Sequence, residues 1–505
     1  MESISFVSFV QFLFVIQTYE AAQLPKYQAL VYPEVFDGRD EYTKLLKIND
    51  EISLNLEPSS VLHENFFVRS YRDGVAEHQY YDVEALQKNF YHDKRHLAAV
   101  ILSQEDGTLQ VEGVIGPNLK IRPTESAERS EHGRRAHLIE SIEEADPVRA
   151  YGKRWEDVAK VDERAGTPKT GFDSTKYNVR HIYPEIFVVC DTWFHSGFRT
   201  NESMIEYLMV TFEVVNIRYS LTRFPNIQLV LMGIELSHWK QEHKYYKYVG
   251  GDDIDGYASL LNLVTFLNEA SERYRMFDLV YFATGYDMVI LDRTKREESL
   301  GGYAFVASAC TDHRVQLGED RAHTYKGIRT TAHEVAHTLG CSHDGTSAPG
   351  VAKAFTPDSL GCPWEDGYIM SYKEEDSRSM KFSSCCQYDM RRMSWSYEGA
   401  CLHINNTDLM PINWKNVSAL PGTFLTKDLQ CRLTYPELYR TRHLPNMGWG
   451  CRAYCSVPGY QFGGADYYWP MYLIDGSPCE SYENNICLNG DCVRNLTYER
   501  RQRRY

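Results

Sequence analysis

The middle of the chain alternates between short, wholly apolar runs and longer segments with helical spacing. Ile186–Cys190 is a continuous apolar run, which is typical of a strand buried on both faces. Apolar residues recur every three or four positions over 201–219 and 257–274, so each segment predicts a helix. Because strands and helices alternate, the pattern predicts an α/β layer around a largely parallel sheet. Further strands are predicted at residues 227–234, 277–284 and 302–307.

The regions on either side have different patterns. Residues 109–115 and 119–123 read as two short strands joined by a Gly-Pro-Asn turn. Residues 124–146 are polar and charged, which predicts a linker. The predicted division is an N-terminal region at 23–177, an α/β domain at 178–402 and a C-terminal module at 403–505.

The first residues resemble a targeting segment. Ile4–Ile16 is an apolar run with the length of a signal-peptide core, too short to cross a bilayer. Ala21 and Ala22 follow where cleavage is expected, so residues 1–22 are predicted to be a signal peptide. No later run reaches the roughly 18 apolar residues that a membrane helix needs. We therefore expect a secreted, extracellular protein without a transmembrane segment.

Composition and cysteine placement narrow the function further. Asp and Glu number 69 against 54 Lys and Arg, which gives a net charge of −15. That excess disfavours nucleic acid as a partner, because such binding neutralises phosphates with Lys and Arg. The chain has 13 cysteines, and none precedes Cys190, so the later regions are expected to fold with disulfides in an oxidising compartment. Glycosylation sequons, which also fit secretion, begin at Asn201, Asn405, Asn416 and Asn495.

The strongest chemical signal is the segment His333-Glu334-Val-Ala-His337-Thr-Leu-Gly340-Cys-Ser-His343. On a helix, His333 and His337 lie on one face and can share a metal ion. Gly340 can adopt a positive φ, end the helix and turn the chain back. The turn would bring His343 in as a third ligand and leave a fourth position open for water, as catalytic zinc sites require. Glu334, beside the first ligand, can reach that water.

This spacing resembles the zinc signature of the metzincin metalloproteases, and Asp344 after the third histidine resembles their reprolysin (adamalysin) branch. Met370 in Tyr-Ile-Met-Ser is similar to the methionine of the family's Met-turn, which lies under the zinc ligands without coordinating the metal. The resemblance implies a metzincin α/β domain with an active-site helix and one catalytic Zn²⁺. It also implies that Glu334 is the general base of a metalloendopeptidase.

Other parts of the domain extend the resemblance. Residues 300–310 are similar to the edge strand on which the family binds substrate, so Gly302, Tyr303 and Ala304 are expected to pair with a peptide backbone. Several family members hold a structural calcium. The corresponding residues here are Glu185, Asp278 and, one position later than the family pattern, Asn405.

The C-terminal module resembles the cysteine-rich module of adamalysins with thrombospondin motifs, although no thrombospondin repeat follows. A protease with a short cysteine-rich region and a basic tail is the arrangement of the salivary reprolysin-like metalloproteases of blood-feeding arthropods. The six cysteines of the module allow fifteen connectivities, and the sequence leaves them open.

Three features depart from the family. Positions 1–189 contain no cysteine, so the family's propeptide thiolate cannot occupy the zinc here. Cys190 makes the cysteine count of the α/β domain odd and is expected to be a buried free thiol. Tyr372 stands where astacins and serralysins place a tyrosine that approaches the zinc, whereas Asp344 opposes an astacin-like interpretation.

Among the remaining cysteines, Cys310 is expected to pair with Cys401, and Cys341, Cys362, Cys385 and Cys386 with one another.

The sequence therefore predicts a secreted, monomeric zinc endopeptidase that acts on extracellular matrix or plasma proteins, with residues 23–177 as its propeptide. The alternative is a catalytically silent binding protein that keeps the metalloprotease scaffold and engages a partner through its cysteine-rich module.

Overall fold

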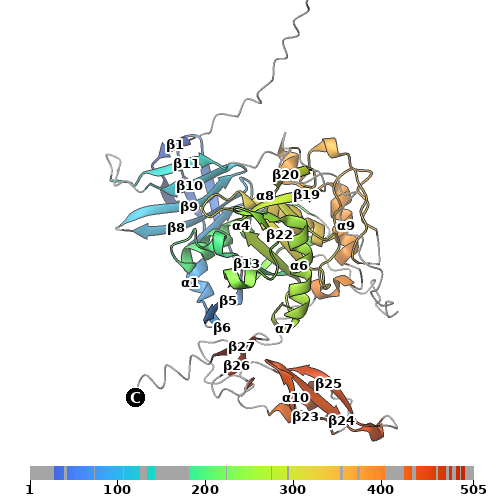
Figure 1. Cartoon of the computed structure of the whole chain (residues 1–505). Helices are drawn as coiled ribbons and strands as arrows, with labels where there is room; N and C mark the ends of the chain where they lie inside the picture. The colour runs from blue at the N-terminus through green and yellow to red at the C-terminus, as the bar shows by residue number, and fades with distance from the viewer. Residues whose placement is uncertain are drawn as a thin grey trace, which may run out of the picture.

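The computed structural model describes residues 28–142, 181–403 and 426–494, apart from short gaps within each range. The predicted signal peptide at 1–22 and the basic tail after residue 494 lie outside the described residues. Three parts follow one another along the chain (Figure 1): a β-rich N-terminal region, a central α/β domain and a small disulfide-rich module. This order confirms the predicted architecture.

The N-terminal region forms a sheet of nine strands in which every neighbouring pair is antiparallel. Apolar residues of its strands, among them Leu46, Leu54, Val100 and Val111, share a core of their own. In sheet order the strands are β1 (Gln28–Val31), β11 (His137–Ser141), β10 (Leu119–Pro123), β9 (Thr108–Gly116), β8 (Ala98–Glu105), β7 (Phe90–Asp93), β4 (Ser53–Pro58), β3 (Lys44–Lys47) and β2 (Glu34–Asp37).

Strand β11 corrects the predicted linker at 124–146. His137–Ser141 lies between β1 and β10 and pairs with both. His137 and Ile139 are buried there. The polar composition of the surrounding segment therefore concealed a strand that is paired along both of its edges. The predicted strands at 109–115 and 119–123 are confirmed as β9 and β10.

The central sheet confirms the predicted parallel layer. Strands β22, β18, β13 and β15 are parallel neighbours, and β21 pairs with β22 in the antiparallel direction. In sheet order its strands are β21 (Gly302–Ala304), β22 (Val315–Glu319), β18 (Leu279–Thr284), β13 (Glu185–Cys190), β15 (Val230–Leu236), β5 (Leu62–Arg72), β6 (Val75–Tyr80), β27 (Asp491–Arg494) and β26 (Asn485–Leu488). The sequence did not predict β22, and the predicted strand at 227–234 is divided between β14 (Asn226–Ile227) and β15.

Helices cover both faces of this sheet. Ile186, Val188 and Cys190 of β13 share one apolar cluster with helix α4 (Asn201–Tyr219) and helix α8 (Gly327–Thr338). The alternate residues of β13 pack in a second cluster with α6 (Gly256–Glu269). Helix α4 has the predicted bounds, because Thr200 Oγ1 caps its start by accepting a hydrogen bond from Ser203 N at 3.1 Å. The predicted helix at 257–274 is divided into α6 and α7 (Ser271–Tyr274).

The C-terminal module consists of helix α10 (Lys427–Thr434), a sheet of three strands and the hairpin β26–β27. The three strands are β23 (Arg442–Trp449), β24 (Arg452–Val457) and β25 (Tyr467–Tyr472). Its disulfides are Cys431–Cys455, Cys451–Cys487 and Cys479–Cys492.

The central domain contains three further disulfides. Cys310–Cys401 has the predicted pairing, and the other two are Cys341–Cys386 and Cys362–Cys385. Among the described residues Cys190 is the free cysteine, and it is buried as predicted. In the part of the chain that the structure describes, no helix is long and apolar enough to cross a bilayer.

Candidate active site

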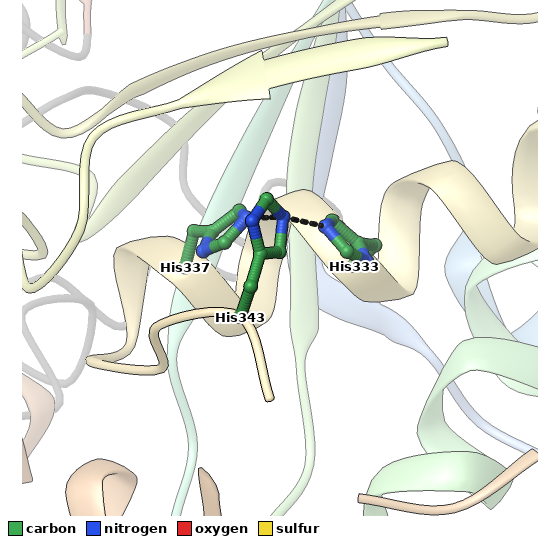
Figure 2. A group of neighbouring side chains, drawn as sticks. All are labelled: His333, His337 and His343. Atoms are coloured by element: carbon green, nitrogen blue, oxygen red, sulfur yellow. Dashed lines mark hydrogen bonds between the residues drawn. The ribbon is translucent and has the colours of Figure 1, made fainter. Parts of the chain in front are cut away.

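Helix α8 and the turn that follows it bring the three predicted histidines together. His333 and His337 point from the same face of α8, and His343 returns toward them (Figure 2). The Nε2 atom of His343 lies 3.0 Å from that of His333 and 3.1 Å from that of His337. All three side chains are buried, and the three ligand atoms lie within 4.8 Å of one another.

Backbone carbonyls orient two of these rings. The Nδ1 of His333 lies 2.9 Å from the carbonyl oxygen of Ile369, and the Nδ1 of His337 lies 2.7 Å from that of Cys341. A carbonyl can only accept, so each Nδ1 carries the proton and each Nε2 presents a lone pair. The His343 Nε2 has at most one proton to share between these two lone pairs. The arrangement therefore fits a cation at the centre of the triad.

Burial keeps the triad in the neutral form that binds metals. It lowers the pKa of His337 to about 4 and the pKa values of His333 and His343 well below the usual 6.5. Neutral imidazole nitrogens in this number are the donors that catalytic zinc sites use, with a fourth position left for water. The donor set thus fits Zn²⁺.

Glu334 lies beside the triad under the edge strand of the sheet. Its side chain is 2% exposed, and Oε2 has no hydrogen-bond partner among the described residues. Burial raises the pKa of its carboxyl well above the usual 4.5. A Cβ atom built on Gly302 of β21 would lie 2.6 Å from Glu334 Oε1, so only glycine lets the strand pass this close. A carboxyl group with a raised pKa suits proton transfer to and from a reacting group.

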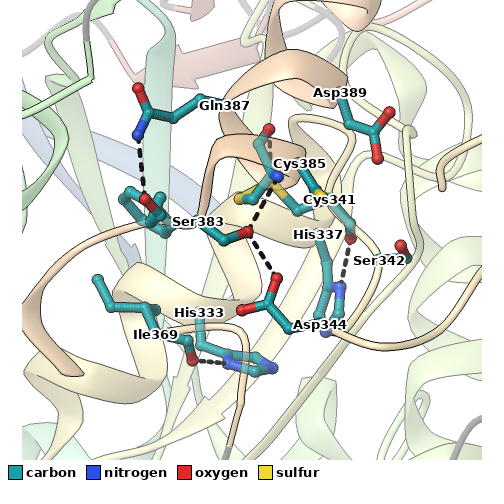
Figure 3. Close-up of a disulfide and its surroundings, with 12 residues drawn as sticks. His333, His337, Cys341, Ser342, Asp344, Ile369, Ser383, Cys385, Gln387 and Asp389 are labelled. Carbon is teal, nitrogen blue, oxygen red and sulfur yellow. Dashed lines mark hydrogen bonds between the residues drawn. A yellow bond between two sulfur atoms is a disulfide. The ribbon is translucent and has the colours of Figure 1, made fainter. Parts of the chain in front are cut away.

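Gly340 makes the turn that returns His343. Its φ is +124°, and a Cβ there would lie 2.9 Å from the carbonyl oxygen of Asp389. Both observations require glycine. The Cys341–Cys386 disulfide then ties the turn to helix α9 (Ser384–Ser394), as Figure 3 shows.

Asp344 and Met370 hold the segments that underlie the triad. Asp344 is fully buried, and its Oδ1 accepts a hydrogen bond from Ser383 Oγ at 2.6 Å (Figure 3). Its amide donates to the Met370 carbonyl at 3.1 Å. Burial raises the pKa of Asp344 to about 6, although the Ser383 hydroxyl opposes the shift. Met370 is fully buried in the apolar cluster of α8, and the residue before it, Ile369, supplies the carbonyl that orients His333.

A buried arginine that the sequence did not single out fixes the same loop. Arg329, one turn before His333 on α8, donates to the carbonyl oxygens of Ser379 at 2.6 Å and Ser371 at 3.0 Å. These acceptors lie 50 and 42 residues away in the sequence, so no local sequence pattern predicts the contacts. A lone arginine in a helix with few other charges was the one available signal.

The strand that the sequence predicts to bind substrate lies at the edge of the central sheet. Gly302, Tyr303 and Ala304 form β21, the outermost strand of the central sheet. They pair with Gly318, Leu317 and Gln316 of β22, respectively, on the inner side. The outer side of an edge strand presents the groups that pair with an extended peptide.

The predicted calcium ligands are only partly within the described residues. The structure brings Glu185 and Asp278 together, since the Glu185 amide donates to Asp278 Oδ2 at 3.0 Å. Asp278 is buried, which raises the pKa of its carboxyl to about 7, and its Oδ1 has no hydrogen-bond partner among the described residues. The third predicted ligand, Asn405, lies outside the described residues, as does Tyr372. Calcium binding and a zinc-proximal tyrosine stay predictions.

Comparison with known proteins agrees with this geometry. Residues 184–383 match the reprolysin model for Metallo-peptidase family M12. These residues therefore form a reprolysin-type domain of that metallopeptidase family, with a histidine triad of the kind that binds zinc in metzincins.

The relatives include arthropod proteins of two kinds. A "disintegrin and metalloproteinase with thrombospondin motifs like" protein of Bombyx mori is 28% identical over 329 residues, which are 62% of this chain and 44% of that protein. The venom metalloproteinase antarease TserMP_A of Tityus serrulatus is 24% identical over 420 residues, 80% of this chain and 100% of the relative. The venom metalloproteinase BumaMPs1 of Olivierus martensii is 26% identical over 367 residues, 71% of this chain and 88% of the relative. The chain thus spans less than half the length of the Bombyx protein and most of both venom proteins.

Proposed function

We propose that this protein is a secreted zinc-dependent endopeptidase that hydrolyses extracellular proteins, such as those of matrix or plasma. The observation that carries the proposal is the convergence of three buried imidazoles beside the Glu334 carboxyl, directly under an edge strand. The six disulfides, and the venom metalloproteinases among the relatives, support an extracellular location.

Different residues of the chain would bind the metal, align the substrate and transfer the proton during peptide hydrolysis. His333, His337 and His343 would hold Zn²⁺, which supplies Lewis-acid chemistry by polarising the scissile carbonyl and lowering the pKa of the attacking water. The backbone of Gly302–Ala304 aligns an extended substrate by pairing with it as a further strand. Glu334 accepts a proton from the attacking water and passes it to the leaving nitrogen, as general base and then general acid. Because Glu334 is shielded from bulk water, the proton stays at the reacting centre.

A structural calcium is a finer proposal for the same domain. Glu185 at the start of β13 and Asp278 just before β18 would provide carboxylate oxygens, the donors that calcium prefers. This site would join two strands of the sheet and stabilise the domain without taking part in catalysis.

Cleavage of an unfolded protein by the purified chain, with zinc content measured in parallel, tests the proposal. We expect one zinc per chain and cleavage at internal bonds, which a chelator abolishes and added zinc restores. Zinc binding without cleavage, both by the intact chain and by the chain cut between residues 142 and 181, would instead favour the silent binding protein.

A further inference from the structure

The N-terminal region and the α/β domain share one sheet. Strand β5 lies parallel to β15, with Gly233 opposite Phe67 and Glu235 opposite Arg69. The hairpin β5–β6 continues to β27 of the C-terminal module, where Ala76 pairs with Val493. A segment from the first quarter of the chain thus lies between the two later parts.

A buried ion pair joins β5 to β15. Arg69 and Glu235 are both fully buried, and Arg69 Nη1 donates to Glu235 Oε2 at 2.8 Å. Tyr71, also on β5, donates its hydroxyl to Glu235 Oε1 at 3.0 Å. The guanidinium lies over the Phe187 ring of β13, 4.9 Å from its centroid. Removing the Arg69 side chain alone would leave the Glu235 carboxylate buried without its countercharge, which is strongly destabilising.

The α/β domain carries a second adaptation to β5. A Cβ built on Gly233 would lie 2.8 Å from the carbonyl oxygen of Phe67 and 2.9 Å from the Phe187 ring. Glycine at this position of β15 lets the β5 backbone approach. The same glycine also leaves room for the Phe187 ring of β13, so it serves the packing inside the α/β domain as well as the contact with β5.

Helix α4 shows the same dependence on a second surface. It has 19 residues, and 15 of them are buried, so no face of the helix is left to solvent. One side packs on the central sheet, and the N-terminal strands β8 and β9 cover another. Phe90, Ala99 and Val114 of the N-terminal region belong to the same apolar cluster as α4. Across this junction His92 Nδ1 lies 2.9 Å from Glu213 Oε1 of the helix.

We infer that residues 28–142 are a permanent structural part of the protein and stay bound to residues 181–494 after any cleavage in the segment between them. The ion pair, the close approach of β5 at Gly233 and the cover of helix α4 are three separate contacts that the α/β domain would lose on separation, and loss of the N-terminal strands would expose apolar residues of α4 to water. The region is then a retained subunit, which differs from the detachable propeptide that the sequence predicts. The inference concerns assembly and does not depend on the proposed peptidase activity.

The test uses the full chain with a recognition site for a sequence-specific protease inserted between residues 150 and 175 and an affinity tag after residue 505. After complete cleavage, confirmed on a denaturing gel, the C-terminal part is captured and washed in native buffer at neutral pH. We expect the N-terminal fragment to be retained at about one copy per captured chain and released by denaturant. Release of the fragment in native buffer overturns the inference, whatever the captured part then does.

Substitutions on β5 test whether the contacts of Arg69 and Tyr71 with Glu235 hold the two parts together. In the cleaved complex Arg69→Ala should raise the dissociation rate about 100-fold or more, because it leaves Glu235 charged and buried. Arg72→Ala is the matched control, since that side chain is 67% exposed, and it should change the rate less than about twofold. If Arg69→Ala does not fold, Tyr71→Phe removes one hydrogen bond to Glu235 and should raise the rate about tenfold. Equal dissociation rates for the wild type and for the Arg69 or Tyr71 variant tested would show that these contacts do not hold the N-terminal fragment in place.

Discussion

Gly302 provides a test of how closely the edge strand β21 packs against the Glu334 carboxyl group. A Cβ at this position would lie 2.6 Å from Glu334 Oε1, 2.7 Å from Glu334 Cγ and 2.8 Å from Thr330 Cγ2. Ordinary carbon contacts are about 3.5 Å or longer, so Gly302→Ala must move the glutamate or the strand by roughly an ångström. A misplacement of about 1 Å in an active site can cost about 100-fold in rate. We therefore expect kcat/KM to fall about 100-fold.

The assay measures hydrolysis of an internally quenched peptide together with zinc content and urea unfolding. Gly302→Ala should keep its zinc and lose about 1–3 kcal/mol of unfolding free energy, as overpacked cores do. Gly116→Ala is the control, because a Cβ there has no neighbour within 4 Å, and both activity and stability should be unchanged. Activity of folded Gly302→Ala within twofold of the wild type would refute the placement of β21 over Glu334.

Three further predictions concern stability. Arg329→Met removes two hydrogen bonds from a buried charge to Ser379 and Ser371, so the unfolding free energy should fall by about 3 kcal/mol in urea; a change below about 0.5 kcal/mol would show that this arginine does not hold the loop. Burial lowers the pKa of His137 to about 4, whereas the unfolded chain has the usual 6.5, so the unfolded state gains protons first as the pH falls. Its contribution to stability is complete above pH 6.5 and is lost as the pH falls toward 4. His137→Gln should flatten the pH profile of the unfolding free energy between about pH 6.5 and 4. An unchanged profile would contradict the assignment of this pH dependence to His137. Millimolar calcium should raise the melting temperature of the wild type and leave that of Asp278→Asn unchanged, and equal shifts would argue against a site at Glu185 and Asp278.

Much of the site could be predicted from the sequence because its signals are local. The helical spacing of His333 and His337 and the positive φ of Gly340 depend on a few adjacent residues, and the structure has both. Helix α4 has its predicted bounds for the same reason, since its cap and its apolar pattern lie within one segment.

The features that the sequence did not reveal depend on partners far along the chain. Arg329 contacts carbonyl groups of a loop more than 40 residues away, and Gly302 is explained by Glu334, which follows 32 residues later. Strand β5 reads as part of an N-terminal region, and only its pairing with β15 places it in the central sheet. Strand β11 was hidden because its buried residues are few and lie among charges.

The most direct test of the central claim is the activity of Glu334→Gln measured beside its zinc content. The substitution keeps the size of the side chain, but the amide cannot accept and return a proton, while the three histidines remain. We expect one zinc per chain in both proteins and a kcat/KM for the variant that is about 100- to 10,000-fold lower. Equal cleavage by the wild type and the variant, with equal zinc, would contradict the assignment of Glu334 as the general base and with it the proposed mechanism.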